Sequence, residues 1–153
     1  MKAYRICQTR YIDTAFEGTG SARAGGRWNA IGQAVVYLAE HRGTAALELM
    51  VHTPKSALKT MRFSIFEVDI PDDLIAVVDV VTWPIGWDSI PETNASIRIG
   101  SEWYEARETL ALKVPSVIVH HESNVLLNPA HPDFAQVRIE PPEPFVFDDR
   151  LSR

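Results

Sequence analysis

Hydrophobic residues gather in short runs along the chain, and their spacing predicts how the first half folds. Residues 35–38 form an apolar, β-prone run typical of a strand, and residues 44–52 form a compact helical stretch rich in Ala, Leu and Met. In residues 63–70, FSIFEVDI, apolar side chains recur with a period close to two, which favours another strand. The predicted order is therefore strand, helix, strand.

The second half repeats this mixture. Apolar runs predict strands at residues 77–81, 117–119 and 136–140, the last before a proline-rich terminal arm. Apolar and amphipathic side chains spaced by three or four predict a helix over residues 101–114, ended by Pro115. Residues 83–99 contain two prolines and a glycine before that helix and are predicted to be a loop.

A glycine-rich segment separates the first predicted strand from the N-terminal residues. Residues 17–33, EGTGSARAGGRWNAIGQ, hold five of the eight glycines and few bulky apolar groups, so we expect an irregular surface loop. Structureless loops of this length are usually functional or disordered. The fold class that follows is α/β, a mixed α+β arrangement in one domain over residues 1–153.

Composition places this domain among ordinary globular proteins. With 153 residues, 46% of them hydrophobic and 23% charged, the chain can bury a core that needs neither disulfides nor a structural metal. Its single cysteine, Cys7, cannot close an intramolecular disulfide, which favours a reducing compartment. No run resembles a signal peptide or a membrane span, so we expect a cytoplasmic protein that does not bind membranes.

The net charge of -5 argues against a broad surface for DNA or RNA, so any phosphate recognition is expected to be local. The five histidines form neither H-E-x-x-H nor a Cys-x-x-Cys pairing, and we expect no metal. The glycines of residues 18–26 fit neither the dinucleotide fingerprint nor the P-loop, and no nucleophile elbow surrounds Ser116.

Glu48 is the first candidate for chemistry, because it stands between leucines in ALELMVH, a helix that is apolar on nearly every face. Its carboxylate is either part of a structural salt bridge or a solvent-facing group, or it points into a cleft. In a cleft, a fixed carboxylate stabilises the positive charge that develops on a sugar carbon when a glycosidic bond loosens.

Two arginines and a tyrosine complete the candidates that the residues suggest. Arg27, within GGRWN, either binds phosphate oxygens, with Arg5 as a second such residue, or merely caps the loop or stacks on Trp28. Tyr37, eleven residues before Glu48, either stacks on a flat base or belongs to the core.

Taken together, the segments GGRWNAIGQAVVYLAE, ALELMVH, VPSVIV and ESNVLLNPAHPDFAQVRI resemble the RES domain, the toxin half of RES-Xre toxin–antitoxin pairs. The resemblance runs nearly end to end, and Ala24 is its one noticeable departure, away from the key positions. The Arg, Glu and Ser of the family name fall on Arg27, Glu48 and Ser116. The resemblance also implies a pocket tyrosine at Tyr37 and recurrent polar positions at Arg5 and Asn124.

For function, the resemblance implies a fold similar to that of ADP-ribosyltransferase toxins, with central β-sheets flanked by helices. It also implies degradation of NAD at the nicotinamide–ribose bond, by phosphorolysis or hydrolysis. NAD is then a substrate, not a cofactor, and inorganic phosphate is a possible co-substrate.

The implied roles follow. Arg27 and Arg5 bind phosphate groups, Tyr37 packs on the nicotinamide or its ribose, Glu48 stabilises the ribosyl cation, and Ser116 and Asn124 bind polar parts of the ligand. Catalysis is thus assigned to Glu48, Arg27 and Tyr37.

Two alternatives stay open: a protein ADP-ribosyltransferase, and a non-catalytic module that binds NAD or a partner. In each case the resemblance implies an Xre-like antitoxin and a homodimer within the toxin–antitoxin complex. We expect the antitoxin to cover the cleft formed by residues 18–32 and to insert its terminus toward Arg27.

Overall fold

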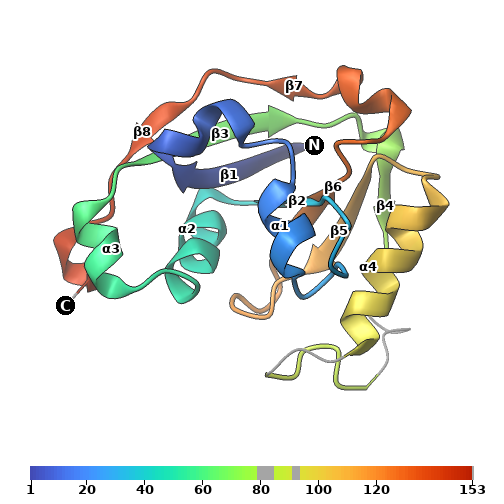
Figure 1. Cartoon of the computed structure of the whole chain (residues 1–153), viewed down its shortest axis with the longest axis horizontal. Helices are drawn as coiled ribbons and strands as arrows, with labels where there is room; N and C mark the ends of the chain where they lie inside the picture. Colours follow the sequence, from blue (N-terminus) through green and yellow to red (C-terminus); the bar gives the residue numbers. More distant parts are fainter. Residues whose placement is uncertain (79–84, 91–93, 153) are drawn as a thin grey trace.

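A computed structural model describes residues 1–78, 85–90 and 94–152, and its centre is one strongly curled sheet (Figure 1). The eight strands of the described residues follow the order β4-β5-β6-β2-β1-β3-β7, with β8 also paired to β3. Among these strands β4 and β5 pair in parallel, and the other pairings between described strands are antiparallel. The strands are β1 (Lys2–Gln8), β2 (Val36–Ala39), β3 (Phe63–Asp69), β4 (Ile75–Val77), β5 (Ala111–Pro115), β6 (Ser123–Leu127), β7 (Arg138–Ile139) and β8 (Glu143–Phe145).

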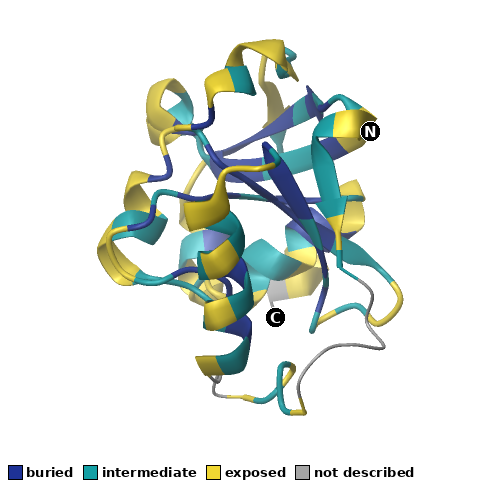
Figure 2. Ribbon diagram, turned by 90° about the vertical axis from the view of Figure 1, so that its right-hand side faces the viewer, coloured by how far each residue is buried: buried dark blue, intermediate teal, exposed yellow. Residues whose placement is uncertain are grey.

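Helices and short 3-10 segments cover the sheet, and the buried residues are concentrated on β1, β2, β3, β5 and β6 (Figure 2). The α-helices are α1 (Thr19–Ala24), α2 (Arg42–Val51), α3 (Lys55–Thr60) and α4 (Asn94–Ala106). The 3-10 segments are η1 (Thr9–Thr14), η2 (Asp72–Leu74), η4 (Pro132–Gln136) and η5 (Asp149–Ser152).

The central strands bury both of their faces, because alternate residues of a strand point to opposite sides. On one side Val36, Leu38, Val125 and Leu127 pack with hydrophobic side chains of η1, η2 and η4. The other side carries two separate apolar clusters. One packs β1 and β3 against α2 and α3, and the other packs β5 and β6 against α4 and Trp28.

The mixed α/β class is confirmed, and so are several predicted elements. Residues 35–38, 44–52 and 63–70 correspond to β2, α2 and β3, shifted by one or two residues at their ends. The predicted strand at 77–81 overlaps β4 at Val77, and its residues 79–81 lie outside the described part. The strand predicted at 136–140 shrinks to β7.

The predicted helix over residues 101–114 is wrong in its extent. Helix α4 begins earlier, at Asn94, within the segment predicted as a loop, and ends at Ala106. Arg107 then adopts a left-handed conformation with φ of 52°, and His131 Nε2 donates to its carbonyl oxygen at 3.1 Å. Residues 111–115 form β5 instead, so Pro115 ends a strand.

The strand predicted at residues 117–119 is also wrong. The Ser116 hydroxyl oxygen accepts hydrogen bonds from the backbone N–H groups of Ile118, at 3.1 Å, and Val119, at 3.0 Å. A serine hydroxyl that binds the backbone two and three residues ahead holds it in a turn. This turn joins β5 to β6, a strand that the hydrophobic pattern did not reveal, as it did not reveal β1.

One further expectation needs correction. The glycine-rich segment is not wholly irregular, because residues 19–24 form α1, which is capped by Gly25 with φ of 72°. The proline-rich terminal arm contributes a strand for which the sequence analysis made no prediction. Its residues Glu143–Phe145 form β8 and pair with the start of β3, since edge strands tolerate a proline that cannot donate to the ladder.

Candidate active site

A polar cluster lies at the seam between the two apolar clusters that share one face of the sheet. Asn124 of β6 is paired with Ala39 of β2 on one side and with Val114 of β5 on the other. Ala39 belongs to the cluster under α2 and Val114 to the cluster under α4. A polar side chain at this register position therefore stands where the apolar packing is interrupted, next to α2.

Glu48 lies on α2 next to this position, and two side chains from other elements bind its carboxylate. Its Oε1 accepts hydrogen bonds from Asn124 Nδ2 at 2.6 Å and from Ser116 Oγ at 2.9 Å. Both donors are neutral, and within the described residues Glu48 forms no ion pair. The described residues thus give no support to the salt-bridge alternative for Glu48, and none of them pairs a cation with its negative charge.

Ser116 is buried, with 3% of its surface exposed. Its hydroxyl donates to Glu48 and accepts from the two backbone N–H groups of the turn that follows β5. A hydroxyl has one proton to donate, and here that proton is engaged. In this structure Ser116 contacts Glu48, and a bond from its hydroxyl to a ligand would require that contact to change.

Tyr37 is half-buried on β2, and its hydroxyl fixes the turn that carries Arg27. The hydroxyl donates to Asn29 Oδ1 at 2.7 Å and accepts from the backbone N–H of Trp28 at 3.2 Å. Gly26 passes so close that a Cβ there would lie 2.6 Å from the Tyr37 hydroxyl oxygen. The double glycine thus allows the turn to approach Tyr37. The sequence analysis did not identify Asn29 as part of the site. This residue is only 1% exposed, which is unusual for an asparagine.

Arg27 is occupied by backbone carbonyls instead of standing free. Its Nη1 donates to the carbonyl oxygens of Trp87, at 3.2 Å, and Ser89, at 3.0 Å. The rings of Trp87 and Trp28 stack with 6.1 Å between their centroids. Arg27 therefore ties residues 85–90 to the turn over Tyr37, as the loop-capping alternative predicts.

Arg5 of β1 has no carboxylate partner within the part of the chain that the structure describes. Its Nη1 donates to the carbonyl oxygen of Tyr37 at 2.9 Å, while its Nε is enclosed and has no hydrogen-bond partner among the described residues. Burial lowers the pKa of Arg5, because water no longer stabilises the charged form. A buried, incompletely satisfied guanidinium is suited to an anionic ligand.

The predicted residues therefore fall into two neighbouring groups joined by β2. Glu48, Ser116 and Asn124 form one group through direct hydrogen bonds. Arg5 and Tyr37 form the other, with Arg27 on the turn that the Tyr37 hydroxyl holds. Because Tyr37 and Ala39 are two residues apart on β2, they share a face, and Ala39 is opposite Asn124.

Thr44 is a residue that sequence reasoning missed. It lies one helical turn before Glu48 on α2, is only 2% exposed, and its Oγ1 has no hydrogen-bond partner among the described residues. Its spacing of four residues from Glu48 on a predicted helix was the available signal.

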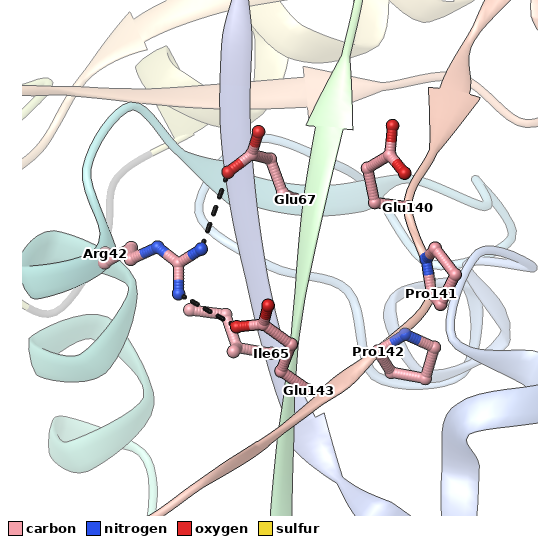
Figure 3. A pocket seen from close by; sticks show the side chains of 7 residues that line it. All are labelled: Arg42, Ile65, Glu67, Glu140, Pro141, Pro142 and Glu143. Atoms are coloured by element: carbon pink, nitrogen blue, oxygen red, sulfur yellow. Dashed lines mark hydrogen bonds and ion pairs between the residues drawn. The ribbon is translucent and has the colours of Figure 1, made fainter.

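The hollow in Figure 3 is a separate feature. It has a volume of about 400 Å³ and is lined by Arg42, Ile65, Glu67, Glu140, Pro141, Pro142 and Glu143. None of the six predicted site residues lines it. Arg42 bridges Glu67, at 3.4 Å, and Glu143, at 3.5 Å, across its mouth. Lys2 also pairs with Glu67, and Arg138 pairs with Glu140, so each carboxylate of the lining has a cationic partner.

No cluster of His, Cys, Asp and Glu in the described part of the chain is arranged to hold a metal ion. Within the same residues, no helix has the length and apolar character needed to cross a membrane.

Comparison with known proteins assigns the family. The RES domain matches residues 2–148, so the chain belongs to the RES domain family. It is 40% identical to the "Prs ADP-ribosylating toxin" of Sphingobium sp. (strain YBL2) over 139 residues, covering 89% of this chain and 86% of that protein.

It is also 39% identical to "Toxin Res" of Yersinia enterocolitica over 154 residues, covering 99% of this chain and 100% of that protein. "Toxin Res" of Photorhabdus laumondii is 40% identical over 134 residues, covering 88% of this chain and 85% of that protein. The resemblance to the RES domain is therefore confirmed.

The fold has a solved counterpart. A chain in the crystal structure of the M. tuberculosis MbcT-MbcA toxin–antitoxin complex superposes with a TM-score of 0.74, covering 95% of this chain and 84% of that chain. Only 17% of the aligned residues are identical, so the comparison concerns the fold.

Proposed function

We propose that this protein is a toxin that consumes NAD by breaking the bond between nicotinamide and ribose. The observation that carries the proposal is the Glu48 carboxylate, fixed by two neutral donors and without an ion-pair partner among the described residues. When this bond breaks, its electron pair stays with nicotinamide, and positive charge builds on the ribose carbon. A preorganised, uncompensated carboxylate stabilises that charge.

Arg5 supplies the complementary charge. NAD carries an anionic diphosphate some distance from its cationic nicotinamide ring. The two groups of side chains joined by β2 provide the opposite charges: the cation of Arg5 suits the diphosphate, and the anion of Glu48 suits the ribose beside the nicotinamide. Arg5 is our first choice for binding the diphosphate, because a single carbonyl oxygen is its hydrogen-bond partner within the described residues. Arg27 would reach a phosphate only after releasing the carbonyls of Trp87 and Ser89.

The acceptor defines the product, and our first choice is phosphate or water. A phosphate oxygen that bonds to the ribose carbon gives ADP-ribose-1''-phosphate; water gives ADP-ribose and a proton. NAD is then the substrate, and no further cofactor is needed. The test is to incubate the purified protein with NAD, with and without phosphate, and to determine the masses of the products by mass spectrometry. A protein that leaves NAD intact under both conditions would exclude phosphorolysis and hydrolysis, and would leave transfer to a target protein and the non-catalytic module.

A second candidate is transfer of ADP-ribose to a protein, favoured by the name of the Sphingobium relative, an ADP-ribosylating toxin. The same bond is broken, and a protein side chain replaces phosphate or water. NAD labelled on its adenine distinguishes the two. Label that stays with a target protein after denaturation supports transfer; label found only in small molecules supports phosphorolysis or hydrolysis.

An antitoxin partner of the Xre-like class is part of the proposal, with a homodimer of this chain inside the complex. Support comes from the fold shared with a chain of a toxin–antitoxin complex. We expect the antitoxin to cover residues 18–32 and place its C-terminal carboxylate near Arg27. Inhibition should then weaken as NAD rises. An inhibition constant indifferent to NAD, with an antitoxin terminus that can be deleted harmlessly, would place the partner on a remote surface.

A further inference from the structure

We infer that Asn124 is a positioning residue whose amide fixes the direction of the Glu48 carboxylate, and not a residue that binds the ligand through that amide. The inference rests on the proposed NAD cleavage. Asn124 Nδ2 lies 2.6 Å from Glu48 Oε1, a short distance for a nitrogen donor and a carboxylate.

Both hydrogen bonds to Glu48 fall on the same oxygen. Asn124 and Ser116 approach Oε1 from β6 and from the turn after β5, while α2 carries the carboxylate itself. Three separate elements therefore define the plane of the carboxylate, and Oε2 receives no hydrogen bond from the described residues. This leaves Oε2 as the oxygen that faces the developing cation.

The amide of Asn124 can have only one orientation here. Turning it over would place its Oδ1 against the negatively charged Oε1, and the two oxygens would repel each other. In the observed orientation Oδ1 is buried without a partner, although only 9% of Asn124 is exposed. A buried acceptor without a partner costs stability, so an apolar residue would suit this position in the sheet better. The amide is therefore explained by its contact with Glu48.

The test is an acid rescue of Asn124→Asp. Near neutral pH the introduced carboxylate repels Glu48, and we expect nicotinamide release to fall about a hundredfold. When the two carboxyl groups share one proton, the pair regains the single negative charge and the O–H donor of the native arrangement. The rate relative to wild type should then rise at least tenfold from about pH 7.5 to about pH 5.

Two variants serve as controls. Asn124→Ala cannot donate at any pH, so its rate should fall without acid rescue, with kcat reduced more than KM is raised. Asn94→Asp, at the exposed start of α4, should behave like wild type throughout. The charged groups on the elements around Asn124 include the ion pairs His41–Glu122 and Lys113–Glu40. They are unchanged in every variant, so their titration affects variant and wild type alike and cancels in the ratio.

A second readout does not depend on activity. In the ligand-free protein, the side-chain amide protons of Asn124 should exchange slowly with solvent by NMR, and faster in Glu48→Gln. Slow exchange together with acid rescue supports the inference. The inference is overturned if the rate of Asn124→Asp relative to wild type does not change with pH, or if the Asn124 amide protons of the wild type exchange fast. Slow exchange in a wild type that leaves NAD intact refutes the proposed function instead, and the role in catalysis falls with it.

Discussion

Glu48 and Glu67 are two carboxylates of this domain that are held in opposite ways. Glu48 receives hydrogen bonds from the neutral side chains of Ser116 and Asn124, whereas Glu67 forms ion pairs with Lys2 and Arg42 at the hollow of Figure 3. The hydrogen bond from Lys2 holds the pKa of Glu67 below its ordinary value, and the charge of Arg42 acts in the same direction. The negative charge of Glu67 is thus balanced by these two neighbouring cations.

The difference separates a hollow whose charges are paired from a carboxylate that forms no ion pair within the described residues. The hollow beside Glu67 has a volume of about 400 Å³, and each of its carboxylates already has a cationic partner: Glu67 and Glu143 pair with Arg42, and Glu140 pairs with Arg138. Glu48 is fixed in direction by two neutral donors, and a fixed, unpaired charge is what electrostatic catalysis requires. This contrast, and not the shape of the surface, is the reason for the proposed role of Glu48.

The largest expected effect is on the rate of NAD cleavage. Glu48→Gln keeps the shape of the side chain and removes its charge, so nicotinamide release should fall by about 10²- to 10³-fold. Glu67→Gln removes a carboxylate of the same type from the hollow and should release nicotinamide at the wild-type rate. A comparable loss in both variants would break the distinction between the two carboxylates.

A second effect concerns the buried cation. Arg5→Gln should raise the KM for NAD by about 10- to 100-fold, as expected for losing a charge-assisted hydrogen bond to the diphosphate. Stability should change little, because burial already disfavours the charge of Arg5. The matched control is Arg42→Gln, which removes a guanidinium from the hollow. If the control raises the KM and Arg5→Gln does not, the diphosphate binds at the hollow.

A third effect tests how the site is supported. A Cβ on Gly100 of α4 would lie 1.8 Å from the Trp28 carbonyl oxygen, in the turn that holds Tyr37. Because backbone must move, Gly100→Ala should destabilise the protein by about 1–3 kcal/mol and lower the Tm by several degrees. Gly20→Ala is the control in α1, where a Cβ meets nothing within 4 Å. Equal Tm values for both variants would show that α4 is not packed tightly against the turn.

The smallest effect is the pH dependence of the Glu67 ion pairs. A carboxyl group whose pKa is lowered in the folded state stabilises that state above its ordinary pKa, here 4.5, and loses the contribution as the pH falls through the lowered value. The Tm of Glu67→Gln should therefore lie slightly below wild type near neutral pH, and the gap should close at acid pH. A gap that widens on acidification would contradict the pairing.

Local patterns predicted the elements that depend on local chemistry. Strand β3 and helix α2 follow from a period of two and from residues that favour helices. The helix predicted over residues 101–114 failed, because the hydrophobic spacing continues past Arg107 while its left-handed backbone, bonded to the distant His131, ends the helix. That contact joins residues 24 positions apart and leaves no mark on the local pattern.

The site was predicted by residue type and position, and its geometry was not. Glu48 stood out as a charge among leucines, and the resemblance to the RES domain added Ser116 and Asn124. That both side chains bind the same oxygen of Glu48 depends on the pairing of β6 with β2 and on the turn after β5, neither of which was predicted. Arg27 was predicted to grip phosphate, and its contacts with Trp87 and Ser89 depend on a segment 60 residues away.

The central claim is that the charge of Glu48 acts on the transition state more than on bound NAD. The most direct measurement combines the dissociation constant for NAD with the single-turnover rate of nicotinamide release, in wild type and in Glu48→Gln. We expect the rate to fall at least about a hundredfold while the dissociation constant rises less than about tenfold. An unchanged rate, or a loss carried entirely by weaker binding, would contradict the claim.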